Sequence, residues 1–279
     1  MPVSSPHPRQ RALPALERVT TELRRAKEDS FTGAQVAVAF LTVQAARHSS
    51  RRNGYVNTVL SVRVGSAVGS CAAEPGELDD ELVREIVGGD VAALLEHPSA
   101  AVRVAVLDAY LADSAPHAGH PRSSTVRVPA GTSLEKSLAR ARAVADLVLV
   151  PPGGRVAVIG VVNSLLAALR ERGSSCAPCD LKGGLTEWGE TVLTDHQQAI
   201  DGADAVLASG MVLGNGTFDE IADVCRTRDL PLVVFAQTGS AVFREMLGEE
   251  ITALSAEPYP FFWLSGEDTA IHLYRGGPA

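Results

Sequence analysis

Residues 204–218 place a buried strand, a glycine-bearing loop and a helix start in direct succession. The run 204–209 (DAVLAS) is short and apolar, and Thr217 with Glu220 three residues later predicts a capping box. Gly214 and Gly216 leave the loop backbone free of side chains. Such a unit presents backbone N–H groups at the carboxyl edge of a sheet, where open α/β proteins bind anionic parts of small ligands. The segment therefore predicts an α/β fold that handles a small molecule.

The second half of the chain repeats this alternation of strands and helices. Thr132 and Glu135 predict another capping box, and helices separate the apolar runs that follow it. The strands are expected at 155–160, 175–180, 204–209, 230–236, 251–254 and 269–273. Parallel strands need crossover connections, so this order predicts a mostly parallel, Rossmann-like sheet covered on both faces.

The first half of the chain has a different order of predicted elements. A helix is expected at 11–28, strands at 35–43, 55–64 and 66–72, and helices at 79–88, 90–97 and 99–112. Strands first and helices after them indicate a smaller α+β domain with helices on one face of an antiparallel sheet. Residues 113–131 are dense in turn formers and predict a linker. We therefore expect a loose tail over 1–10, an α+β domain over 11–115 and a Rossmann-like domain over 130–279.

Composition narrows the function classes. The chain of 279 residues carries a formal charge of −8, which argues against a general nucleic-acid binder. No apolar run approaches the roughly 20 residues that cross a bilayer, and residues 1–10 have no apolar core of a signal peptide. Four cysteines in a chain of this size do not make a disulfide framework, so a reduced, cytoplasmic setting is expected.

The loops after the parallel strands should gather at one edge of the sheet. The first contains Gly160, Val161 and Asn163, and its single glycine argues against a standard NAD pyrophosphate site. Asp180 follows the second strand, where an acid can accept hydrogen bonds from both hydroxyls of a ribose. The alternative is that Asp180 is only a loop-capping acid.

Two further loops carry polar side chains beside predicted helix starts. Asn215 and Thr217 belong to the third loop, and Thr238 and Ser240 belong to the fourth. Two adjacent helix starts suit a carboxylate or a phosphate. A ribose-binding acid beside a carboxylate cradle would fit S-adenosylmethionine, used by a transferase or a lyase, although the glycine-rich first loop of most methyltransferases is absent.

Cysteine and histidine pairs support a competing hypothesis. Cys176 and Cys179 form a C-x-x-C pair, and His117 and His120 form an H-x-x-H pair in the linker. Either spacing can serve a metal, but a structural zinc site normally has two such pairs. Unpaired thiols are the simpler interpretation.

The segment 181–194 contains glycines and could form a mobile lid over a ligand. The candidate acid–base residues are Glu187 and Glu190 in this segment and His196 just after it, and Trp188 could cover a ligand face. A solvated loop with one anchoring aromatic is the alternative. The aromatic residues of 257–263 favour packing or an oligomer contact, for example in a homodimer.

The run 210–217 (GMVLGNGT) resembles a "G-x-x-L-x-N-x-T" segment of a Rossmann-like family named for heavy-metal chelation, whose function is not established. Residues 236–241 depart from that family's next loop because they lack its proline, and 161–163 replace the Phe-Pro type of loop expected there. The resemblance implies an amino-terminal domain like that of enolases, with its helix at 100–111 and Asp108 where Asn is usual. It also implies a site in the cleft between the domains.

Two functions follow from these observations. The first is an enzyme that acts on an adenosyl or amino-acid-like ligand in the interdomain cleft. The alternative is a protein that binds a metal or a metal chelate without catalysis. A purely structural partner-binding module fits less well, because the glycine-bearing loops all lie at one edge of the sheet.

Overall fold

The computed structural model describes residues 13–26, 30–47, 54–74, 76–260 and 265–276. The expectations for the tail 1–10, for most of the turn 49–54 and for the aromatic residues 261–263 concern residues outside these ranges. No helix within the described ranges is long and apolar enough to cross a membrane.

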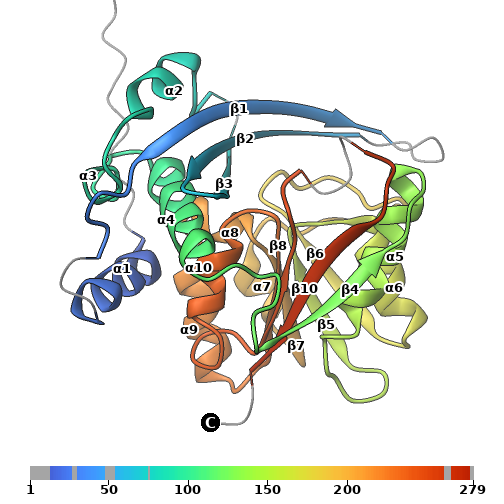
Figure 1. Ribbon diagram of the computed structural model, residues 1–279. Helices are drawn as coiled ribbons and strands as arrows, with labels where there is room; N and C mark the ends of the chain where they lie inside the picture. The colour runs from blue at the N-terminus through green and yellow to red at the C-terminus, as the bar shows by residue number, and fades with distance from the viewer. Residues whose placement is uncertain (1–12, 27–29, 48–53, 75, 261–264, 277–279) are drawn as a thin grey trace, which may run out of the picture.

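A three-stranded antiparallel sheet, in the order β1-β2-β3, arches over the strands and helices of the second half of the chain (Figure 1). Its strands are β1 (Val36–Ala46), β2 (Tyr55–Val64) and β3 (Ala67–Ala73). The helices of this part are α1 (Pro14–Ala26), α2 (Asp80–Ile86), α3 (Val91–Leu94) and α4 (Ala100–Ser114). Leu60 and Val62 of β2 are fully buried because that face of the sheet belongs to the core that it shares with α4. The expected succession of strands and helices is therefore confirmed in its order.

Helix α4 lies unusually close to strand β3. An ideal Cβ atom on Gly69 would lie 2.1 Å from the backbone N of Ala109 and 2.3 Å from the backbone O of Ala105. Only a residue without a side chain leaves room for this approach. Gly69 thus sets the distance between α4 and the antiparallel sheet.

The larger sheet has seven strands in the order β4-β10-β9-β8-β7-β5-β6. The strands are β4 (Ser123–Val128), β5 (Arg155–Ile159), β6 (Ser175–Cys179), β7 (Ala205–Ser209), β8 (Leu232–Ala236), β9 (Ala253–Ala256) and β10 (Thr269–Arg275). The five from β9 to β6 are parallel, and β10 is antiparallel to both of its neighbours. The sequence-based prediction of a mostly parallel α/β sheet is confirmed.

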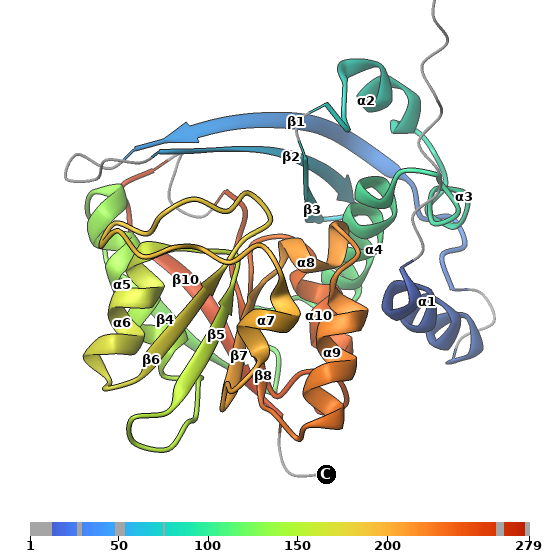
Figure 2. The same cartoon turned by 180° about the vertical axis from the view of Figure 1, so that it is seen from behind.

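Helices cover both faces of the large sheet (Figure 2). They are α5 (Ser133–Ala145), α6 (Asn163–Glu171), α7 (His196–Ile200), α8 (Met211–Gly214), α9 (Phe218–Thr227) and α10 (Ser240–Glu245). Helices α5 and α6 share one core cluster with one face of the sheet. Helices α7, α9 and α10 share the other cluster with α4 and the antiparallel sheet, so the two halves of the chain have a common core.

Two local predictions were wrong. Strand β4 lies inside the expected linker 113–131, as an edge strand paired with β10. Thr217 makes no side-chain cap at α9, because α8 precedes it and its backbone is already helical. Its hydroxyl instead donates to Asn215 Oδ1 at 2.8 Å. By contrast, the capping box of Thr132 and Glu135 is present.

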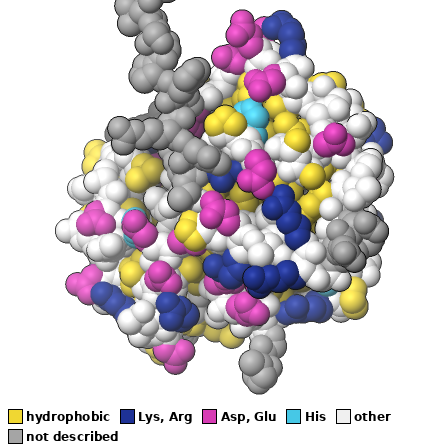
Figure 3. Space-filling model, turned by 90° about the vertical axis from the view of Figure 1, so that its left-hand side faces the viewer, with side chains coloured by type: hydrophobic (Ala, Val, Ile, Leu, Met, Phe, Trp, Pro, Cys, Tyr) yellow, Lys and Arg dark blue, Asp and Glu magenta, His cyan; other side chains and the backbone are white. Residues whose placement is uncertain are grey.

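The face that carries α1 has acidic and basic side chains interspersed (Figure 3). Several of them pair across the fold, as Arg24 does with Glu96 at 3.0 Å and Arg18 with Glu250. A face of mixed sign offers no extended basic surface to a polyanion.

Candidate functional site

A cavity of about 300 Å³ lies between the antiparallel sheet and the carboxyl ends of the parallel strands. Gln44, Asn57 and Ala72 line it from the antiparallel sheet. Ser209 and Phe235 line it from the ends of β7 and β8. A topological crevice of this kind is where open α/β sheets bind their ligands, because the loops after the strands converge there.

Seven of the eight candidate ligand-binding residues line this cavity: Gly160, Val161, Asn163, Asp180, Asn215, Thr217 and Thr238. Asp180 follows β6, and its carboxylate accepts hydrogen bonds from Val161 N at 3.3 Å and from Lys182 N at 3.0 Å. It is therefore a loop-capping acid that also faces the cavity. The convergence expected of the strand-end loops is present in the structure.

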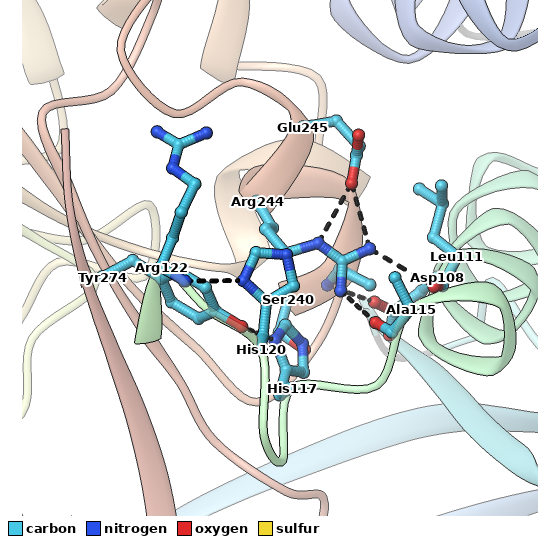
Figure 4. Close-up of polar contacts among 11 residues, drawn as sticks. Asp108, Leu111, Ala115, His117, His120, Arg122, Ser240, Arg244, Glu245 and Tyr274 are labelled. Carbon is cyan, nitrogen blue, oxygen red and sulfur yellow. Dashed lines mark hydrogen bonds and ion pairs between the residues drawn. The ribbon is translucent and has the colours of Figure 1, made fainter. Parts of the chain in front are cut away.

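Ser240 does not line the cavity. Its Oγ lies 3.1 Å from His117 Nε2, beside Arg244 and the start of α10 (Figure 4). The buried carboxylate of Asp108 caps that helix, accepting from Ala241 N at 2.7 Å and from Ser70 N at 3.0 Å. Because a side chain of the protein itself occupies the anion position at this helix start, the predicted cradle of two helix starts does not form.

The buried Asp108 carboxyl should make the stability of the folded protein depend on pH. Burial raises its pKa to about 6, against the opposing effect of backbone hydrogen bonds from Ser70, Ala241 and Gly239 and of Arg244. The folded state holds this proton more tightly than the unfolded chain, so the stability it adds is present below about pH 4 and lost as pH rises through about 6.

When the pH rises from 4 to 7, the unmodified protein should therefore lose on the order of 2 kcal/mol of unfolding free energy relative to its Asp108→Asn variant. Urea unfolding of both proteins at the two pH values measures this. A difference that is constant with pH would contradict it.

Arg140 of α5 lines the cavity, and the sequence did not indicate it. It is 4% exposed, and its Nε donates to Glu257 Oε2 at 3.0 Å. Its guanidinium carbon lies 5.1 Å from the ring centroid of Phe235. Nη1 is buried and makes no hydrogen bond within the described ranges. Buried N–H groups normally have partners, so this nitrogen lacks the hydrogen bond that its burial calls for.

The segment 181–194 contributes to the rim but not through its predicted acids. Glu190 pairs with Arg170 at 2.6 Å, and Arg170 also stacks on Trp188 at 4.3 Å from the ring centroid. Neither glutamate of this segment lines the cavity, whereas Lys182 does. Trp188 is 46% exposed, so the solvated loop with an anchoring aromatic describes it better than a cover over a ligand.

The cysteine and histidine pairs do not form metal sites. Cys176 and Cys179 are three residues apart on β6 and pack in different core clusters, on opposite faces of the sheet. Burial raises the pKa of Cys179 to about 11, so the free thiol stays protonated at neutral pH.

His117 uses both ring nitrogens, on Tyr274 Oη at 2.7 Å and on Ser240. Burial and then the charge of Arg244 lower its pKa to about 3. Among the described residues, no three His, Cys, Asp or Glu side chains gather as a metal site would require.

These features define a Rossmann-like α/β protein with a cavity beneath a small antiparallel sheet. Residues 143–234 match the model of the DUF364 family, described as "Putative heavy-metal chelation", which confirms the resemblance expected from the sequence. No curated protein matches the chain.

Two solved structures from the DUF364 family are similar to this chain in fold. One, from Desulfitobacterium hafniense DCB-2 and of unknown function, is 12% identical with a TM-score of 0.60, over 94% of this chain and 98% of that one. The other, from Pyrococcus horikoshii and also of unknown function, is 15% identical with a TM-score of 0.57, over 94% of this chain and 99% of that one. At these identities the likeness shows the fold.

Proposed function

We propose that the protein binds a small organic molecule with an anionic group in the cavity between the two sheets. The single observation that carries this proposal is the buried Nη1 of Arg140, which has no hydrogen-bond partner among the described residues. A guanidinium that is fixed by Glu257 on one side can donate to a ligand carboxylate or phosphate on the other. The cavity volume of about 300 Å³ lies at the lower end of those of ligand pockets.

The charges around the cavity are mixed. Lys182 adds a second cation to the lining, while Asp180 and Glu74 add carboxylates. A simple inorganic anion would lie beside these acids with nothing to offset their charge, so the proposed ligand combines an anionic group with a cation or with hydrogen-bond donors. Both an adenosyl amino acid and a metal chelated by an organic acid have that combination.

The metal chelate is the ligand that we favour. The family description points to a heavy metal, but the described residues contain no group of three metal-ligating side chains that could hold a bare ion. A metal that arrives already chelated needs the protein to recognise the anionic chelator instead of supplying most of the ligands. This is binding without a catalytic step.

An adenosyl amino acid is the second candidate, and Asp180 is the observation that favours it. The carboxylate lies at the end of β6, and it still has lone pairs for ribose hydroxyls beyond its two backbone donors. Binding of S-adenosylmethionine would place its carboxylate toward Arg140.

Thermal unfolding with a ligand panel separates the candidates. A ligand that binds only the folded state adds roughly 2.7 kcal/mol at a hundred times its dissociation constant. We expect nitrilotriacetate and its nickel complex each to raise the unfolding temperature of the protein, and to do so in its Asp180→Asn variant as well. A rise with S-adenosylmethionine that is lost in this variant would favour the adenosyl ligand. If no member of the panel raises the unfolding temperature, the proposed binding of organic anions is wrong.

A further inference from the structure

His196 lines the cavity and has a carboxylate beside one of its ring nitrogens. Its Nε2 is buried 3.3 Å from Glu220 Oε2 of α9, and it makes no aligned hydrogen bond there. No hydrogen bond joins the other ring nitrogen, Nδ1, to any of the described residues. A histidine that ligates a metal through one nitrogen commonly has a carboxylate beside the other, which orients the ring and raises its basicity.

His196 and Arg140 approach the cavity from opposite faces of the large sheet. Arg140 belongs to α5, whose core cluster includes α6, whereas α7, which begins at His196, belongs to the cluster of α9 and α10. Both residues line the cavity at the carboxyl edge between these faces. One small ligand in the cavity can therefore be held by its anionic group on one side and by a second group on the other.

We propose that His196 Nδ1 binds the metal of a chelate whose carboxylates face Arg140. The inference rests on the proposed function, since it assigns the second contact of the same ligand. A neutral imidazole suits nickel, copper and zinc, and a chelator that leaves coordination positions open allows one protein ligand to complete the sphere. Glu220 is the positioning residue, because it lies against Nε2.

A chelated metal needs only one protein ligand, and a larger donor cluster is absent among the described residues. A single imidazole does not strip a metal from its chelator. It discriminates between the loaded and the empty chelator, while the guanidinium supplies an attraction that both share. The site would thus select metal-loaded molecules over free organic acids.

The test compares copper(II) nitrilotriacetate, which leaves coordination positions open, with metal-free nitrilotriacetate and with copper(II) EDTA, which leaves few. Isothermal titration should give at least about tenfold tighter binding of the open copper complex than of the metal-free chelator. Electron paramagnetic resonance of the bound copper should show nitrogen coupling from one imidazole. Copper(II) EDTA should bind no more tightly than metal-free nitrilotriacetate.

Variants show whether the His196 imidazole causes the tighter binding of the copper complex. His196→Gln should abolish the gain and the imidazole coupling, leaving only the coupling of the chelator's own amine nitrogen, while the affinity for metal-free nitrilotriacetate stays unchanged. Glu220→Gln should keep the coupling but weaken copper-complex binding. His120→Gln, a histidine away from the cavity, is the matched control and should behave as the unmodified protein.

Two outcomes overturn the inference. If nitrilotriacetate binds but copper adds nothing, or adds the same in His196→Gln, then His196 is not a metal ligand and the proposed anion site stands. If neither form of nitrilotriacetate binds, both the inference and the proposed function fail.

Discussion

Replacing Arg140 by glutamine should lower the free energy of unfolding by about 3 kcal/mol, because it leaves a buried carboxylate without its cation. Glu257 is 3% exposed, and its Oε2 accepts the hydrogen bond from Arg140 Nε. Gln237 Nε2 lies at 3.4 Å and Ser255 Oγ at 3.0 Å from this carboxylate, so neutral donors remain, but no second charge among the described residues forms an ion pair with it. Urea unfolding at neutral pH measures the loss.

Two comparison proteins make this prediction specific. In Arg140→Gln/Glu257→Gln both charges are removed together, so most of the lost stability should return. Arg142→Gln lies on the same helix, at an exposed side chain 3.8 Å from Glu171, and should change stability by less than about 0.5 kcal/mol. Equal losses in Arg140→Gln and Arg142→Gln would show that the Glu257 carboxylate does not depend on Arg140.

Gly69→Ala should destabilise the protein by about 3 kcal/mol or more, or prevent folding. The new methyl would meet the backbone of α4 at Ala109 and Ala105, and a helix backbone cannot rotate away as a side chain does. The helix must move off the sheet, which opens the shared core. Thermal or urea unfolding gives the size of the loss.

Gly131→Ala is the control for this substitution. There the nearest atom to an added Cβ is Glu135 Oε2 at 2.9 Å, at the far end of a flexible side chain. Gly131→Ala should therefore lower the free energy of unfolding by much less than Gly69→Ala. A Gly69→Ala protein as stable as Gly131→Ala would mean that α4 does not rest on β3 as closely as described.

Much of the fold followed from sequence because the signals are local. Buried parallel strands are short apolar runs between helices, and their loops must meet at one edge, which is why Asp180, Asn215 and Thr238 were found together. The edge strand β4 (SSTVRV) was missed because it is half polar and mostly unburied, so it looks like the linker around it.

The parts that failed depend on contacts between distant residues. Asp108 caps α10 from a helix 133 positions earlier in the chain, so nothing near Ser240 reveals that its helix start is occupied. Arg140 is held by a glutamate 117 positions later, and an isolated arginine in a helix is ordinarily read as a solvated residue. The opposed faces of Cys176 and Cys179, in contrast, could have been inferred from the two-residue period of a strand.

The most direct test of the account is the affinity of nitrilotriacetate for the protein and for Arg140→Gln/Glu257→Gln, measured by isothermal titration. Comparable urea unfolding of the two proteins ensures that folding does not decide the result. We predict one saturable site in the unmodified protein and at least about tenfold weaker binding in the double variant, since a charged hydrogen bond is lost. Equal affinity in both would contradict the claim that Arg140 receives the anionic group of the ligand.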